Sequence, residues 1–204
     1  MELLFNTNIQ FFILAYLVGG VPFGLLLAKS FAGVNIKESG SKSIGATNVL
    51  RVVKEKDPKL AKKLGAATLV LDALKAIVVL ALAKFVGLSE ATLWGMGILA
   101  VLGHCFSPYL GFEGGKGVAT GLGVMVFMLP LESVIALVVW AISAKTIKIS
   151  SISSLLALST LIVASFILKP ELAHAPIIII AIILIYKHIP NILRLFSGEE
   201  KRLV

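Results

Sequence analysis

Long runs of apolar residues alternate with short polar segments along this chain. The clearest runs cover residues 9–28, 64–86, 91–102, 150–168 and 175–189. A helix needs roughly 20 apolar residues to cross the hydrocarbon core of a bilayer, and several of these runs approach that length. The pattern therefore predicts an all-α integral membrane protein whose spanning helices are joined by the polar segments.

A further apolar run, at 118–144, is interrupted near its middle by Pro130 and Glu132. Proline breaks or kinks a helix, so we expect two short central spans that meet at an external turn. Each half has only about a dozen residues and needs a locally thin bilayer or surrounding protein. This division keeps Lys145 and Lys148 on the inner side, where basic residues gather.

Positive charge is concentrated in the segment 29–63, which has nine lysines and arginines against three acidic residues. Such an excess marks a cytoplasmic loop. The N-terminus is then expected outside the membrane, and the C-terminal segment 187–204 in the cytoplasm. The expected architecture is one polytopic domain, 1–204, with about seven transmembrane helices.

Composition narrows the class of protein. Of the residues, 58% are hydrophobic and 15% charged, whereas soluble domains have about 25% charged residues. The net charge is +8, and the basic residues lie mainly in the segments between the apolar runs. This placement suits contact with anionic lipid or an anionic substrate, so we expect no nucleic-acid partner. The lone Cys105 excludes an intramolecular disulfide. Neither metal-ligand spacing nor a Ser-His-Asp triad is visible, and we expect no metal and no cofactor.

Three polar segments contain the candidate chemistry, and the first reads SGSKSIGATNVLR, residues 39–51. If a helix begins near Thr47, Asn48 and Arg51 share one face. Arginine binds phosphate through two parallel hydrogen bonds, and serines such as Ser41 can cap helices or bind phosphate oxygens. A solvated loop would explain the serines equally well if this segment stood alone.

The second segment, GHCFSPYLGFEGGKGVAT at 103–120, is rich in glycine. Glycines let a backbone point several N–H groups at one anion, and Lys116 adds a mobile positive charge. A nucleotide P-loop would need glycine and a hydroxyl residue where Leu110 and Gly117 stand, so that class is excluded. His104 stays open as a ligand, an acid–base group or a hydrogen-bonded residue at a helix end. A phosphate cradle is the favoured interpretation, and a flexible turn is the alternative.

The third segment, KHIPNILRLFSGEE, covers residues 187–200. His188, Asn191 and Arg194 follow one another at intervals of three and share a helix face if the helix continues through Pro190. An interfacial anchor with a snorkelling arginine is the alternative.

Two groups of polar residues lie within the apolar runs. Asp72 and Lys75 are three positions apart, and an isolated charge in the membrane is costly, so a structural ion pair is expected. The alternative is that Lys75 faces the site. The serines that begin the run at 150–168, Ser153 and Ser154 among them, serve either as helix-packing residues or as hydroxyls that reach the site.

Taken together, the three segments resemble the motifs of the bacterial acyl-phosphate:glycerol-3-phosphate acyltransferase family, known as PlsY. The matching stretches are GATNVLR, GHCFSPYLGF with GGKGVAT, and HIPN with ILRLFSGEE, in this order and between matching spans. The resemblance covers essentially the whole chain. It implies a multi-pass enzyme of the bacterial inner membrane whose active site faces the cytoplasm.

The resemblance also implies functional residues in each segment. The first motif contributes Ser41 and Arg51, and the third contributes His188, Asn191 and a structural glutamate, Glu200 or Glu199. The glycine-rich motif implies glycerol 3-phosphate binding by Gly114, Gly115, Lys116 and Gly117. Further substrate-binding candidates, from their place in the sequence, are Thr47, Asn48, His104, Ser153 and Ser154.

The implied reaction moves a fatty acyl group from acyl phosphate to the 1-hydroxyl of sn-glycerol 3-phosphate. It gives lysophosphatidic acid and inorganic phosphate, the first step of phospholipid synthesis. An acyl phosphate is a mixed anhydride with a good leaving group, so we expect direct attack without an acyl-enzyme. The proton acceptor is His188 or a substrate phosphate oxygen. The expected partners are the two substrates, membrane lipid, the enzyme that forms the acyl phosphate and the next acyltransferase.

Two places depart from the family pattern. Ser43 and Ile44 stand where the family often has asparagine and proline, and Glu113 stands where it usually has lysine. A carboxylate beside a phosphate loop should weaken binding unless Glu113 points away or pairs with a lysine.

A transporter of a phosphorylated small molecule is the alternative function. It too would need a basic, glycine-rich site and short discontinuous spans. The polar segments gather on one predicted face, and the halves of the chain show no repeat, which favours the enzyme.

Overall fold

The structure, a computed structural model, describes residues 6–202, and every regular element in that range is helical. The chain divides into two compact units, Met1–Val124 and Met125–Val204. Five segments of the described chain are long and apolar enough to cross a membrane: Thr7–Ala32, Pro58–Phe85, Glu90–Leu110, Ser150–Leu168 and Ala175–Phe196. The prediction of an all-α membrane protein is confirmed.

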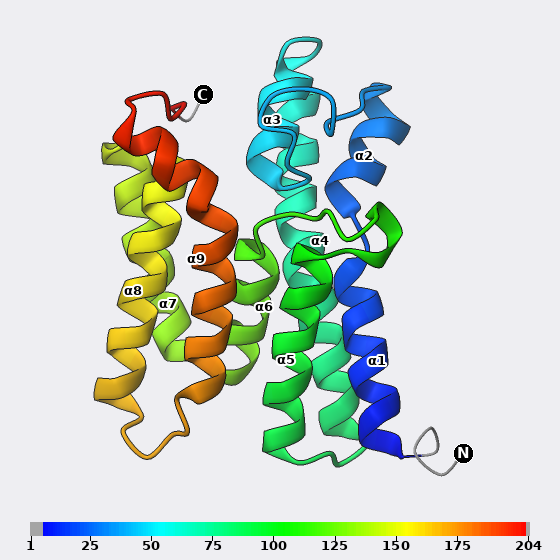
Figure 1. Ribbon diagram of the computed structural model, residues 1–204, viewed down its shortest axis with the longest axis vertical. Coiled ribbons are helices and arrows are strands. Elements are labelled where there is room, and N and C mark those ends of the chain that lie inside the picture. The colour runs from blue at the N-terminus through cyan, green and yellow to red at the C-terminus, as the bar shows by residue number, and fades with distance from the viewer. Residues whose placement is uncertain (1–5, 203–204) are drawn as a thin grey trace. The chain divides into compact units, whose positions relative to one another are not determined.

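Most of the helices are joined by short connections, whereas residues 33–45 and 106–117 form longer ones (Figure 1). The first unit contains α1 (Thr7–Gly20), α2 (Phe23–Ala32), α3 (Ala46–Lys54), α4 (Pro58–Phe85), α5 (Glu90–Cys105), the 3-10 turn η2 (Pro108–Leu110) and the start of α6 (Val118–Met128). The second contains the end of α6, α7 (Pro130–Thr146), α8 (Ser150–Leu168) and α9 (Ala175–Phe196).

The predicted break near Pro130 is present. Helix α6 ends at Met128 and α7 begins at Pro130, so the proline occupies a first-turn position where its missing N–H is not needed. The two helices have 11 and 17 residues, both shorter than the usual spanning length. The number of spans and their orientation stay predictions.

In the first unit, α1 lies against α4 and α5. The approach of α1 to α5 depends on glycine, because a Cβ at Gly19 would overlap the backbone of Ala100 and a Cβ at Gly103 would overlap that of Tyr16. Beyond α5, the Ser107 hydroxyl donates to the Gly20 carbonyl over 2.7 Å. These contacts fix the start of the glycine-rich segment to the end of α1.

A hydrophobic cluster packs α3 against α2 and the first turns of α4. Helix α3 is strongly amphipathic, and its apolar side is buried whereas Lys54 is exposed. The buried members of the cluster are Leu25, Ala28, Ile36, Ile44, Val49, Val52, Val53, Ala61 and Leu64. Because Ile36 and Ile44 belong to the connection between α2 and α3, this cluster anchors both ends of that loop.

In the second unit, α8 packs against α7 and α9. The first turn of α8 and the last turn of α9 lie at the same end of this unit, and the chain after α9 turns back there (Figure 1). That return brings residue 200 to the beginning of α8, where the unit has its main cluster of polar contacts.

Candidate functional site

The loop between α2 and α3 is organised by the side chain of Asn48. This side chain is only 2% exposed. Its Oδ1 accepts from the Ser41 backbone N–H over 2.8 Å, and its Nδ2 donates to the carbonyls of Ile36, Ser39 and Ser43. Asn48 therefore maintains the shape of the loop, and its predicted direct contact with substrate stays a prediction.

Arg51 lies one helical turn after Asn48 and is half-buried. Within residues 6–202, no hydrogen bond or ion pair is assigned to its guanidinium group. Ser41, held by Asn48 through its backbone, is exposed. Helix α3 thus presents an arginine that has no anionic partner among residues 6–202, which is the state expected of a group that binds an external anion.

The glycine-rich segment folds back onto the end of α5. The N–H groups of Gly114 and Gly115 donate to the carbonyls of Cys105 and His104 over 3.1 and 3.0 Å. These two N–H groups are therefore already used within the protein, and the substrate binding predicted for Gly114 and Gly115 stays a prediction. Their glycine character has another reason, since a Cβ at residue 114 would meet the His104 carbonyl and one at 115 would meet the His104 ring.

The remaining predicted phosphate-binding groups lie just after this contact. Lys116 is half-buried, and Gly117 has a φ of 82° and leads directly into α6. The first N–H groups of a helix have no partner within the helix and carry partial positive charge. Lys116 and the start of α6 can together attract an anion, whereas Gly114 and Gly115 shape the turn that carries them.

Glu113, the acidic residue where the resemblance suggests lysine, pairs with Lys37 over 3.2 Å. The carboxylate is largely exposed and Lys37 belongs to the loop between α2 and α3. The negative charge at residue 113 is thus balanced by a cation from the other loop of this unit. This is one of the two arrangements under which the departure was expected to be tolerated.

A buried charged cluster lies beneath the glycine-rich segment. Asp72 and Lys75 of α4 are paired at 2.7 Å, and His104 Nδ1 is 2.9 Å from the Lys75 ammonium and 3.6 Å from Asp72 Oδ1. None of the three residues is more than 4% exposed. The expected ion pair is confirmed, and His104 joins it at the end of α5.

In the second unit, α9 continues through Pro190 to Phe196. His188 is 2% exposed, and its Nδ1 lies 2.7 Å from the Leu184 carbonyl one turn earlier. A carbonyl oxygen only accepts hydrogen bonds, so Nδ1 carries a proton. Neutral His188 then has its lone pair on Nε2, the atom from which it can act as a base.

Asn191 lies one turn after His188 and is 4% exposed. Its Nδ2 donates to Glu200 Oε1, which fixes the orientation of the amide because a carboxylate accepts only. Its Oδ1 is buried, and the described residues supply no hydrogen-bond donor to it. A buried acceptor without a donor is costly, and a substrate hydroxyl is one group that would satisfy it.

Glu200 joins the start of α8 to the last turns of α9 at one end of the second unit. Its carboxylate accepts from Asn191, from the Ser151 hydroxyl over 2.8 Å and from Arg194 Nε over 2.8 Å. Glu199, by contrast, is exposed. Burial acts to raise the pKa of Glu200, but the hydrogen bonds from Asn191, Ser151 and Arg194 outweigh it and hold the pKa below the usual glutamate value.

The serines at the start of α8 have different surroundings. Ser151 binds Glu200, whereas the hydroxyl of Ser153 is buried and donates to the Ile149 carbonyl over 3.0 Å. Ser154 is half-buried. Ser153 thus has the contact of a helix-packing residue, and the substrate contacts predicted for Ser153 and Ser154 stay predictions.

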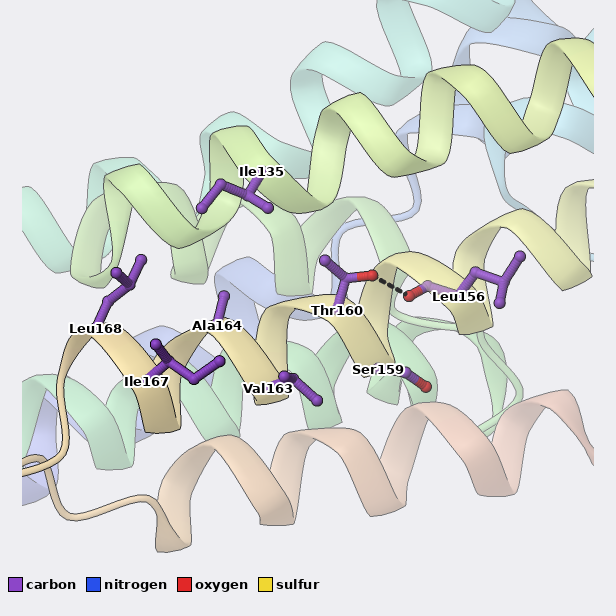
Figure 2. Close-up of a pocket in the computed structure, with 8 residues that line it drawn as sticks. All are labelled: Ile135, Leu156, Ser159, Thr160, Val163, Ala164, Ile167 and Leu168. Carbon is purple, nitrogen blue, oxygen red and sulfur yellow. Dashed lines mark hydrogen bonds between the residues drawn. The ribbon is translucent and has the colours of Figure 1, made fainter.

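An apolar groove of about 500 Å³ runs along α7 and α8 (Figure 2). It is lined by Ile135, Leu156, Ser159, Thr160, Val163, Ala164, Ile167 and Leu168. The Thr160 hydroxyl donates to the Leu156 carbonyl over 2.9 Å and so offers little polarity to the groove. From Leu156 to Leu168 the helix is about 18 Å long, and such a surface suits a hydrocarbon chain.

Two pairs of contacting residues were not identified as pairs from the sequence. Lys37 binds Glu113 across 76 positions, and Ser151 binds Glu200 across 49. Neither pair has a sequence periodicity that would point to it, because each is created by the packing of separate helices. The sequence indicated only that Glu113 could pair with a lysine, and it did not indicate which one.

Comparison with known proteins places this arrangement in context. The model of the family described as glycerol-3-phosphate acyltransferase matches residues 9–198. A protein of Sulfurimonas denitrificans named glycerol-3-phosphate acyltransferase is 74% identical over the full length of both chains. One of the same name from Nitratiruptor is 60% identical and covers 98% of each chain.

Two solved structures are also similar. A crystal structure of PlsY, an integral membrane glycerol 3-phosphate acyltransferase, in its glycerol 3-phosphate form has a TM-score of 0.86 and 33% identity, and the match covers 98% of this chain and 96% of that one. Its lysophosphatidic acid form has a TM-score of 0.83 and 34% identity, with 97% and 95% covered. The likeness thus extends over nearly the whole of each chain.

Proposed function

The chain belongs to the glycerol-3-phosphate acyltransferase family and is of the PlsY type, and we propose that it transfers a fatty acyl group from acyl phosphate to the 1-hydroxyl of sn-glycerol 3-phosphate. The products are lysophosphatidic acid and inorganic phosphate, at the opening of phospholipid synthesis. The strongest support is the full-length likeness to PlsY in its glycerol 3-phosphate form.

The transfer is direct. The glycerol hydroxyl oxygen attacks the acyl carbonyl carbon, an ester C–O bond forms, and the bond from that carbon to the phosphate oxygen breaks. Phosphate is a good leaving group, so no acyl-enzyme is needed. The main tasks of the protein are to hold two phosphate-bearing molecules against their repulsion and to orient the hydroxyl.

Arg51 and Lys116 are the cations that we assign to the phosphate groups. Arg51 is half-buried and has no assigned partner among the described residues, so it can offer two parallel donors to a phosphate. Lys116 follows the turn that Gly114 and Gly115 fix against α5. Ser41 adds an exposed hydroxyl on a loop whose backbone is already held in place.

His188 and Asn191 are the residues that we assign to the reacting hydroxyl. Nε2 of His188 accepts the hydrogen bond of the reacting hydroxyl and takes its proton as the ester bond forms, and Oδ1 of Asn191 accepts from the other hydroxyl of the glycerol and so orients the reacting oxygen. A phosphate oxygen of a substrate is the alternative acceptor. Glu200 fixes the amide of Asn191 in the required orientation.

The basic residues and the apolar helix surfaces indicate how the protein is oriented in the membrane and where the acyl chain lies. The protein is an integral membrane protein, and we place it in the bacterial inner membrane. The segments 29–63 and 103–117 face the cytoplasm in this proposal, because 29–63 carries a large excess of basic residues. The acyl chain lies against apolar helix surface open to lipid, for which the groove along α8 is suited. Acyl phosphate then arrives from the enzyme that forms it, and the product passes to the next acyltransferase.

A two-substrate assay tests this function. Purified protein in detergent receives glycerol 3-phosphate with either acyl phosphate or acyl-CoA, and the acyl ester and released phosphate are measured. We expect ester and phosphate in equal amounts with acyl phosphate only. Ester formed from acyl-CoA alone would disprove the assignment of acyl phosphate as the donor. No ester with either donor would disprove the acyltransferase activity and favour the transporter.

The proton acceptor has its own test. If Nε2 of His188 is the base, His188→Gln lowers kcat by about 100-fold, the low end of typical general-base effects, and leaves the KM for glycerol 3-phosphate unchanged. The matched control is His174→Gln, at a residue stacked on Phe166. Near-full turnover in His188→Gln would assign the proton to a substrate phosphate oxygen instead.

A further inference from the structure

The buried cluster of Asp72, Lys75 and His104 contains more hydrogen bonds than an ion pair alone would need. The Lys75 ammonium has three neighbours at hydrogen-bond distance: Asp72 Oδ1 at 2.7 Å, the Val21 carbonyl at 3.0 Å and His104 Nδ1 at 2.9 Å. A lysine ammonium has three donors and no acceptor. Each of its hydrogens therefore has one acceptor in this cluster.

This arrangement determines the state of His104. Because Lys75 can only donate, Nδ1 of His104 must accept, and the ring proton of the neutral imidazole is then on Nε2. Asp72 pairs with Lys75 over 2.7 Å, and both side chains are buried in a membrane segment, where an unpaired charge is costly. The ion pair thus specifies one tautomer and one ring orientation of the histidine.

The other edge of the His104 ring lies against the glycine-rich segment. A Cβ at Gly115 would meet Nε2, with the neighbouring ring carbons at 3.0 Å. The carbonyl of His104 also accepts from the Gly115 N–H. One residue of α5 therefore contacts Gly115 with both its backbone and its side chain, immediately before Lys116.

We infer that Asp72 and Lys75 are positioning residues that act through His104 on Gly115 and so set the place of Lys116 for substrate phosphate. This inference rests on the proposed function. A simple buried ion pair would only need to be neutral overall. A positioning cluster also needs the donor from Lys75 to Nδ1, and this difference can be measured.

The first experiment reads the tautomer without any activity. The protein is labelled with ring-¹⁵N histidine, and its three histidines are assigned with His174→Gln and His188→Gln. We expect His104 in wild type to show a protonated Nε2 and an unprotonated Nδ1, and Lys75→Met to change this pattern. A protonated Nδ1 in wild type would overturn the inference.

The second experiment separates positioning from stability. Asp72→Asn with Lys75→Met removes both charges and leaves no buried ion unpaired, so its thermal midpoint should stay near that of wild type. We expect the KM for glycerol 3-phosphate to rise about tenfold, because a small displacement of a binding group has effects of this order, with little change in kcat. An unchanged KM in the folded double variant would show a merely structural pair.

Two substitutions at His104 make the same distinction and keep the ion pair intact. The side-chain oxygen of His104→Gln can still accept from Lys75, whereas His104→Leu offers no acceptor. We expect KM near the wild-type value for Gln and about tenfold higher for Leu. Equal values would overturn the inference. Absence of acyl transfer in wild type, with the expected tautomer present, would overturn the proposed function alone.

Discussion

Two polar side chains of α3, Asn48 and Arg51, differ in how many hydrogen bonds they make within the protein. Asn48 is saturated by the loop before it, whereas Arg51, one turn later, has no assigned partner in the described part of the chain. Residue type alone does not reveal this division, because both are ordinary phosphate-binding residues. It indicates that Asn48 shapes the loop and that Arg51 is available for an anion.

Arg51→Lys tests whether the geometry of the guanidinium matters beyond its charge. Loss of a bidentate contact with phosphate should lower kcat/KM for glycerol 3-phosphate by about 10- to 100-fold, the size expected for a charge-assisted hydrogen bond. Lys54→Arg, on the exposed side of the same helix, is the control and should change neither activity nor thermal midpoint. Unchanged kinetics of Arg51→Lys would remove Arg51 from the site.

Gly115→Ala tests the contact below the glycine-rich segment. The added methyl group collides with the His104 ring, so the turn must shift and KM for glycerol 3-phosphate should rise about tenfold. Gly65→Ala is the matched control, because its Cβ would meet only ordinary contacts at 3.4 Å or more and alanine favours the helix. If both variants showed wild-type KM, the close contact at Gly115 would not exist.

At the scale of elements, the loop between α2 and α3 depends on one buried amide. In Asn48→Ala the Ser41 N–H and several carbonyls lose their partner, which should destabilise the protein by about 1–3 kcal/mol. Thermal midpoints in detergent measure this, and tryptic cleavage after Lys42 should become faster. Asn35→Ala, at a partly exposed residue that bonds Glu38, provides the comparison. Equal midpoints would disprove the organising role of Asn48.

The contact between the start of α8 and the end of α9 should depend on pH. Glu200 has a pKa below the usual glutamate value in the folded protein, so its ionised form stabilises the fold at neutral pH. This stabilisation is lost as the pH falls below about 4.3, the ordinary glutamate pKa, through the lower folded value. Glu200→Gln should therefore lower the thermal midpoint at pH 7, and the difference from wild type should shrink in acid.

Glu199→Gln is the control for this titration. Its carboxylate is exposed, and the midpoint should follow that of wild type at every pH. A difference between Glu200→Gln and wild type that stayed constant from pH 7 to pH 3 would mean that the charge of Glu200 does not hold these helices.

Most elements could be predicted from the sequence, for physical reasons. Apolar length identified the spanning helices, Pro130 separated α6 from α7, and α3 begins at Ala46, one residue before the expected start. The direction of the Gly114 and Gly115 N–H groups could not be predicted, because glycine permits many turns and only the carbonyls at the end of α5 select one. The choice of Glu200 over Glu199 likewise depends on how α8 and α9 pack.

At the scale of the whole molecule, the orientation in the membrane is the central prediction. In a Cys105→Ala background, single cysteines replace Lys42, Glu113, Arg194 or Glu171. A membrane-impermeant maleimide added to intact cells should leave the first three unmodified and should label Glu171→Cys, in the turn between α8 and α9. All four should react after the membrane is permeabilised. Labelling at residue 42, 113 or 194 in intact cells would contradict a cytoplasmic active site.

The saturated amide of Asn48 also has a calorimetric consequence. A loop already fixed by four internal hydrogen bonds does not have to freeze when a ligand arrives, so the entropy of ordering it is absent from the binding equilibrium. Titration of glycerol 3-phosphate at several temperatures should then give a small heat-capacity change, since little apolar surface is newly buried. The same rigidity limits how far this loop can adapt to polyol phosphates of another size.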